Sequence, residues 1–193
     1  MKKRGFSTKA FVLVLALVLA LGCVIGGTIA WLTAKTDSVV NTFTVGDINI
    51  TLTESGAVNN ANSYKMVPGC TIDKDPKVTV EAGSEACWLF VKIEKSTNLD
   101  SFITYTVDTG STGWTALTGV DGVYYREVPA TTSDTEFAVL TGNQVTVRND
   151  ITKEMMEALN AENAVLPTLT FTAYAVQKDK VDTATEAWAK VNP

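Results

Sequence analysis

Residues 87–94 read Cys-Trp-Leu-Phe-Val-Lys-Ile-Glu, and this stretch decides the fold class. Leu89, Val91 and Ile93 recur at the two-residue period of a β-strand, so they share one face. The opposite face carries a tryptophan and a phenylalanine next to charged residues. Because both faces have large apolar side chains, we predict a strand in the centre of a sheet.

The same period continues on both sides of this stretch. In residues 43–52 the apolar face changes phase at Gly46, which predicts a β-bulge or bend there. Residues 118–122 contain two glycines and an aspartate, the chemistry of a hairpin turn. Alternation predicts further strands at residues 77–81, 102–107, 114–117, 123–128, 136–140, 144–148 and 168–177.

Two short helices interrupt the strands. Residues 152–160 carry two methionines and a leucine at helical spacing. Thr183 with Glu186 three residues later forms a capping box that predicts a second helix. Many short strands with few helices predict an all-β fold, a two-sheet β-sandwich.

An apolar run at residues 10–32 follows four cations and ends in small residues. This order is typical of an export signal, although the run is also long enough for an uncleaved membrane anchor. Both alternatives place the rest of the chain outside the cell. We therefore predict a signal helix at residues 1–30, an N-terminal segment at 31–45 and a β-sandwich domain at 46–193.

The charge of the exported part is strongly acidic. The chain has 16 Lys and Arg and 21 Asp and Glu residues. Four of the cations lie in the signal, so residues 31–193 keep twelve against 21 acidic groups, a net charge of −9. Such a surface disfavours nucleic acid and anionic membranes as partners. We expect membrane contact only through the signal segment.

Three cysteines are present, of which Cys23 lies in the signal. Cys70 and Cys87 form an even pair in an exported chain, which predicts a disulfide. Free buried cysteines are the alternative. Two thiolates alone do not make a structural zinc site, since zinc takes four ligands.

Catalytic motifs are absent from this sequence. It has no histidine, which excludes Ser-His-Asp and Cys-His pairs and the HExxH zinc motif. The string Asp108-Thr109-Gly110-Ser111 occurs once, and an aspartic protease needs two such loops, so we predict a turn there. Asp73 and Asp75 are too few for calcium and predict a solvated acidic turn. We predict no catalytic residues, cofactor or metal, and hence no enzyme.

Several blocks occur in a characteristic order along the chain. They are residues 26–31 (GGTIAW), 41–50 (NTFTVGDINI), 67–69, 74–80, 88–93 and 170–177. In this order the chain resembles the TasA/camelysin family of exported proteins. The stretch from about residue 97 to residue 149 is the part least similar to the family.

The resemblance implies a jelly-roll form of the sandwich and a signal peptide read by a SipW-type signal peptidase. Cleavage is then expected between Ala30 and Trp31, with cleavage after Ala34 or retention of the signal as alternatives. It also implies a structural protein secreted to the cell surface or biofilm matrix of a Gram-positive-type bacterium. The expected partner is the chain itself, as a homopolymer, or another matrix protein.

In that family, an N-terminal segment of one subunit adds a strand to its neighbour. Residues 31–45 are the expected donor here, with Phe43 and Val45 as anchors, because this segment becomes N-terminal after cleavage. Two other classes remain open from the sequence. One is a monomeric surface module for binding or adhesion, and the other is a camelysin-like peptidase, which the lack of histidine disfavours.

Overall fold

The computed structural model describes residues 8–9, 11–16, 46–55 and 63–191. The chain divides into two compact units, residues 1–44 and residues 45–193. In the first unit the described residues, 8–9 and 11–16, are helical. None of the helices within the described ranges has the length and apolar character needed to cross a membrane. The rest of the predicted signal, its cleavage site at Ala30 and Trp31, and the anchors Phe43 and Val45 lie outside the described residues.

The second unit is built mainly of β-strands, as predicted, with few short helices. The bounds of its strands and helices are β1 Ile50–Thr53, β2 Thr71–Asp73, β3 Lys77–Val80, β4 Cys87–Lys95, η1 Leu99–Ser101, β5 Ile103–Thr104, β6 Thr115–Ala116, β7 Val123–Val128, β8 Thr135–Ala138, η2 Thr141–Asn143, β9 Gln144–Val147, α2 Lys153–Ala158, β10 Leu169–Gln177 and α3 Ala184–Val191.

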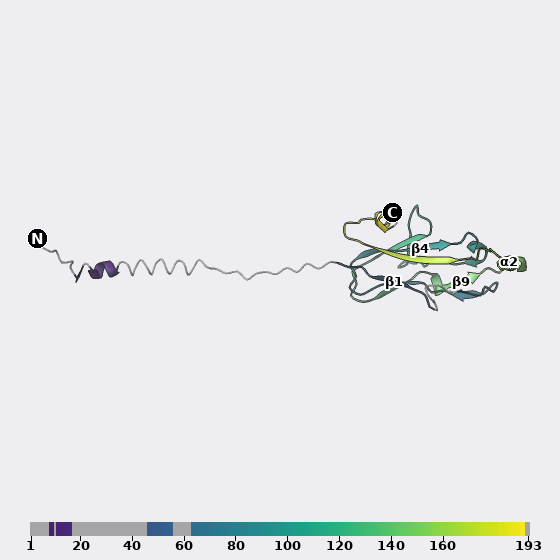
Figure 1. The fold of residues 1–193 in the computed structure, drawn as a ribbon, viewed down its shortest axis with the longest axis horizontal. Helices are drawn as coiled ribbons and strands as arrows, with labels where there is room; N and C mark the ends of the chain where they lie inside the picture. Colours follow the sequence, from purple (N-terminus) through teal and green to yellow (C-terminus); the bar gives the residue numbers. More distant parts are fainter. Residues whose placement is uncertain (1–7, 10, 17–45, 56–62, 192–193) are drawn as a thin grey trace. The chain divides into compact units, whose positions relative to one another are not determined.

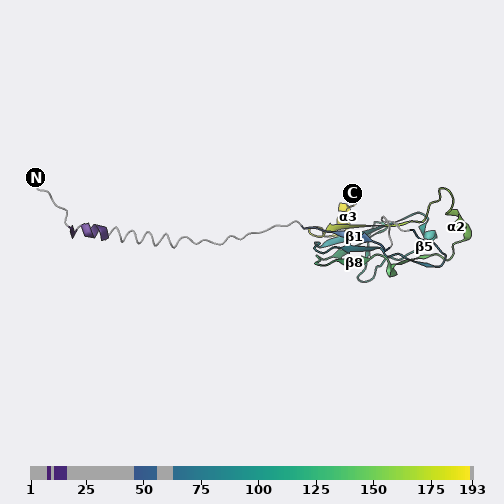
Figure 2. The same ribbon diagram turned by 60° about the horizontal axis from the view of Figure 1, so that its bottom comes forward.

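The strands form three antiparallel sheets with the orders β10-β4-β7-β6, β1-β3-β8 and β2-β9-β5. β4 lies between β10 and β7, so its predicted central position is confirmed. In Figure 1, β4 lies in one layer, while β1 and β9 lie in the other. The turned view places β1 and β8 at one end of the domain and β5 with α2 at the opposite end (Figure 2).

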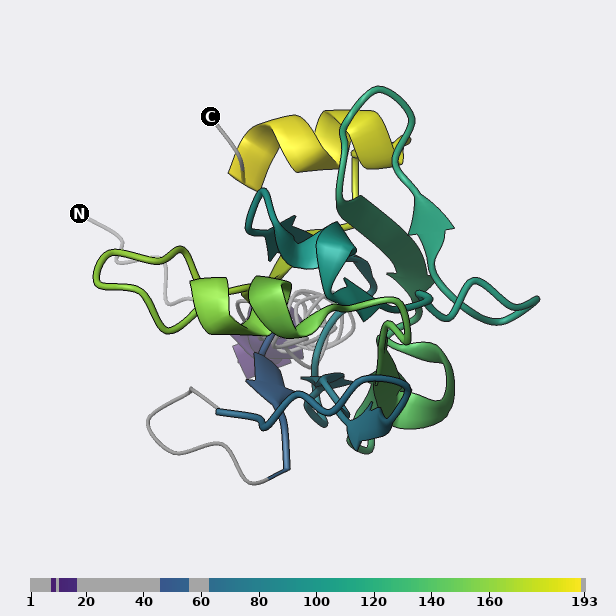
Figure 3. The same ribbon diagram turned by 90° about the vertical axis from the view of Figure 1, so that its right-hand side faces the viewer.

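The four-stranded sheet is covered on both faces. Its inner face, with Leu89 and Val91 fully buried, packs on the main hydrophobic core. Its outer face carries Trp88 and Phe90, which form a second core with Trp188 of α3. Figure 3 shows α3 lying across the outside of this sheet. The aromatic residues on one face and aliphatic residues on the other, read from residues 87–94, therefore reflect two separate cores.

Several predicted elements have different bounds in the structure. β1 begins at Ile50, so Gly46 precedes the strand and does not form a bulge within its described ladder. The stretch 102–107 contains only the short β5, followed by an isolated bridge from Val107 to Leu140. Asp73, expected in a turn, belongs to β2 and pairs with Gln144.

The predicted helix starts and the hairpin are confirmed. The Thr152 hydroxyl accepts a hydrogen bond from the Met155 N–H at 3.3 Å and caps α2. The Thr183 hydroxyl accepts a hydrogen bond from the Glu186 N–H at 3.2 Å and caps α3. Gly119 has a φ of 82°, a left-handed conformation that suits glycine, in the turn that joins β6 to β7.

Candidate functional site

Strand β10 is the longest strand at the edge of a sheet. It has nine residues and pairs with β4 alone, within the described part of the chain. The other edge strands are much shorter, with four residues in β1 and β8, three in β2 and two in β5 and β6. We call the unpaired side of residues Leu169–Gln177 the β10 edge. Unpaired strand edges are where a further strand can add.

The pattern of backbone hydrogen bonds shows which residues of β10 face the open edge. The Ser96 N–H donates to the Thr168 carbonyl at 3.0 Å, and the Lys178 N–H donates to the Ala86 carbonyl at 2.8 Å. Between them the register of β10 on β4 is continuous, without a bulge. Hydrogen-bonded and non-hydrogen-bonded pairs alternate in an antiparallel ladder, so even-numbered residues of β10 bond to β4. The odd-numbered residues therefore direct their N–H and C=O groups toward the open edge: Leu169, Phe171, Ala173, Ala175 and Gln177.

The sequence of this strand lacks the usual protection of an edge. Residues 169–177, LTFTAYAVQ, include no proline, glycine or charged residue. Natural edge strands commonly block further pairing with lysine, proline, a bulge or a short length. β10 has none of these features, so its geometry and chemistry both permit pairing with another strand.

The edge is held rigidly by its two faces. Phe171 and Ala173 pack toward the main core, while Tyr174 packs on the other side against Trp188, with ring centroids 5.2 Å apart. Fixed side chains on both faces mean that the strand does not have to be ordered when a partner binds. An edge ordered in advance lowers the entropy cost of association.

β1 lies beside the β10 edge and is fixed by a nearly buried ion pair. Lys74 Nζ lies 2.8 Å from Glu54 Oε1, and the two side chains are only 10% and 17% exposed. The same ammonium lies 5.4 Å from the centre of the Phe171 ring and 5.3 Å from that of Tyr64. This contact links the end of β1 to the start of β10. This ion pair could not be predicted from local sequence, because its members are 20 residues apart.

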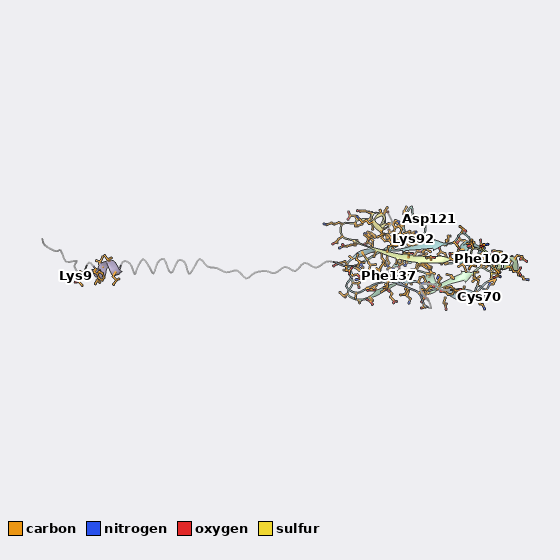
Figure 4. The ribbon with its side chains drawn as sticks, viewed as in Figure 1. Lys9, Cys70, Lys92, Phe102, Asp121 and Phe137 are labelled. Carbon is orange, nitrogen blue, oxygen red and sulfur yellow. The ribbon has the colours of Figure 1, made fainter. Side chains whose placement is uncertain are left out.

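The predicted disulfide is wrong. Cys70 and Cys87 are both free; Cys70 is exposed, and Cys87 is buried. Figure 4 places Cys70 in the layer opposite Lys92, which belongs to β4. The Cys70 carbonyl accepts the Val147 N–H, and Val147 pairs with Ile103, which follows the end of β4. Cys87, in contrast, is the first residue of β4. A nine-residue strand spans about 26 Å, far beyond the reach of a disulfide.

Burial explains the state of the Cys87 thiol. It lies within the main core, and this burial raises the pKa of Cys87 to about 11. A thiol that stays protonated at neutral pH is a poor nucleophile and a poor metal ligand. Cys87 therefore acts as a small core residue, the alternative left open by the sequence.

The candidate acidic sites form structural contacts. The Asp108 carbonyl accepts the Trp114 N–H at 2.7 Å, so the Asp-Thr-Gly-Ser string is a turn, as predicted. Asp75 accepts the N–H and hydroxyl of Ser55 at 2.9 and 2.7 Å, and these bonds hold its pKa below the usual value. Among the described residues, no group of three or more His, Cys, Asp or Glu side chains could hold a metal ion.

Comparison with known proteins gives no relative for this chain: no family model, no curated protein and no solved structure matches it.

Proposed function

We propose that this protein is a secreted structural subunit of a bacterial cell surface or biofilm matrix, assembled into fibres by β-strand addition between copies. We also propose that its three sheets form a two-sheet sandwich of the jelly-roll type. The observation that carries the assembly proposal is the nine-residue β10 edge, which has unpaired backbone groups and no protecting residue. The resemblance to TasA-like proteins supports the same function.

The proposed donor is the segment 31–45 of a second copy. It includes Phe43 and Val45, which alternate with threonines and would serve as anchors. Each backbone hydrogen bond gained at the β10 edge would contribute about 0.5–1.5 kcal/mol. Export through a SipW-type peptidase, with cleavage after Ala30, would release this segment as the new N-terminus.

The path of the chain favours donation to another copy. The Glu85 N–H donates to the Asp47 carbonyl at 3.0 Å, and the adjacent Ala86 carbonyl accepts the N–H of Lys178, the residue after β10. The chain therefore enters β1 at the end of the domain where β10 finishes. A donor on its own β10 edge would have to run parallel to that strand. All described strand pairs are antiparallel. A donor from another copy can run antiparallel, as they do.

An antiparallel donor also sets the form of the assembly. It would leave the acceptor near Leu169, and its own domain would follow beyond that end. Each subunit would then use its donor on one neighbour and its β10 edge on the other. Such a head-to-tail contact produces an open filament when its rotation does not close into a ring, and we propose the open form here.

Deletion of residues 31–45 tests the donor. The chain beginning at Trp31 is expected to form regular fibres that are visible by electron microscopy. The deletion variant should remain a folded monomer by light scattering and circular dichroism, because the domain keeps its core. A matched variant with Phe43→Ser and Val45→Ser should assemble poorly, whereas Thr42→Ser and Thr44→Ser should assemble normally. Fibres that persist after the deletion would refute the donor assignment.

A further inference from the structure

A second surface feature lies away from the β10 edge. It is a groove of about 560 Å³, a size within the range of small-molecule sites. We call it the tyrosine groove. It is lined by side chains from β4, η1, β5, β7 and the segments that follow β5 and β9, including Lys95, Asp100, Thr104, Tyr105, Tyr124 and Arg148. No residue of β10 lines it.

The two tyrosines supply partly covered aromatic surface. Tyr105 and Tyr124 are each half-buried and pack against the main core. Burial raises the pKa of Tyr105, so its phenol remains a neutral donor and acceptor at physiological pH. Within the described residues, neither hydroxyl has a protein hydrogen-bond partner. Each hydroxyl can therefore donate to and accept from a ligand.

The charged groups of the groove are already paired. Lys95 Nζ lies 2.6 Å from Asp100 Oδ2. Arg148 holds Asp150 in two bonds, of 2.9 Å from Nε and 2.5 Å from the terminal nitrogen. These pairs neutralise the groove and leave further donor and acceptor positions on each group. An anionic ligand would have to compete with Asp100 and Asp150, on a chain that is already acidic.

Aromatic rings, threonine hydroxyls and paired charges are together suited to an uncharged, hydroxyl-rich ligand. The apolar C–H face of a sugar ring packs on tyrosine, and its hydroxyls bond to polar groups around the ring. The threonines at positions 104, 106 and 109 add such groups. We propose that the tyrosine groove binds an uncharged polysaccharide chain. This binding does not depend on assembly, because the groove and the β10 edge share no residue.

The test uses two neutral probes, cellopentaose and chitopentaose, with the purified protein and detection by NMR titration. We expect at least one probe to bind with a Kd of about 0.1–1 mM and to shift the resonances of Tyr105 and Tyr124. Tyr124→Ala should weaken this binding about tenfold. Tyr124→Phe keeps the packed ring and should weaken it severalfold, so the test does not rely on the alanine variant folding.

The neighbouring residue provides the control. Tyr125 lies on the opposite face of β7, near Trp88 and Phe90, and Tyr125→Phe should bind as the parent does. Ala173→Pro, at the β10 edge, should also leave binding unchanged. The proposal would be overturned if neither probe bound at about 10 mM, if Tyr124→Ala bound equally well, or if polygalacturonate, an anionic chain, bound more tightly than both.

Discussion

Replacing Ala173 with proline is expected to abolish fibre formation and to leave the domain folded. The Ala173 N–H points to the open side of β10 and makes no bond to β4, by the alternation of the ladder. Proline lacks this N–H, and its ring would occupy the position of an added strand. Edge strands tolerate proline where the N–H faces outward, so the cost to the fold is small.

The adjacent residue makes a matched control. Thr172 pairs with Lys92, and its N–H bonds to β4. Thr172→Pro should therefore remove a backbone hydrogen bond of the four-stranded sheet and lower the free energy of unfolding by at least about 1–3 kcal/mol. Electron microscopy measures assembly and chemical denaturation measures stability. Normal fibres from Ala173→Pro would contradict the β10 edge as the acceptor.

Trp188→Ala is expected to cause the largest loss of stability. Trp188 is 5% exposed, and its ring centre lies 5.3 Å from that of Phe90 and 5.2 Å from that of Tyr174. Truncation would leave a cavity between α3 and the outer face of the sheet. Substitutions of this kind cost about 3–5 kcal/mol. Because Tyr174 belongs to β10, the loss should also loosen the edge and slow assembly.

Denaturation with guanidinium chloride measures this effect. The exposed Lys190, on the same helix, is the control, and Lys190→Ala should change stability by no more than about 0.5 kcal/mol. A loss below about 1 kcal/mol for Trp188→Ala would show that α3 does not hold the outer face of the sheet.

The sequence predicted the structure best where the two-residue period of a strand coincides with burial of its side chains. Leu89, Val91 and Ile93 on one face of β4 and Trp88 and Phe90 on the other face are all buried. Local capping chemistry likewise gave the starts of both helices at Thr152 and Thr183. The short strands β5 and β6 were predicted too long, because alternation continues beyond the point where the backbone leaves its neighbour.

Tertiary proximity could not be read from the sequence. Two cysteines in a chain predicted to be exported suggested a disulfide, but Cys70 and Cys87 are both free. The β10 edge was also missed. Its strand was predicted as residues 168–177. Whether a strand lies at the edge of a sheet depends on which strands pair, and those strands are far apart in the sequence. The lack of charge in residues 169–177 was the one signal that could have indicated it.

Hydrogen exchange at the amides of β10 tests whether subunits join at the β10 edge. The exchange rates are measured in the monomer that lacks residues 31–45 and in fibres of the chain from Trp31. We expect the amides of Phe171, Ala173 and Ala175 to exchange rapidly in the monomer and to become protected in fibres. The even-numbered neighbours Thr172 and Tyr174 should be protected in both states. If the odd-numbered amides exchange as rapidly in fibres as in the monomer, the β10 edge is not where subunits join.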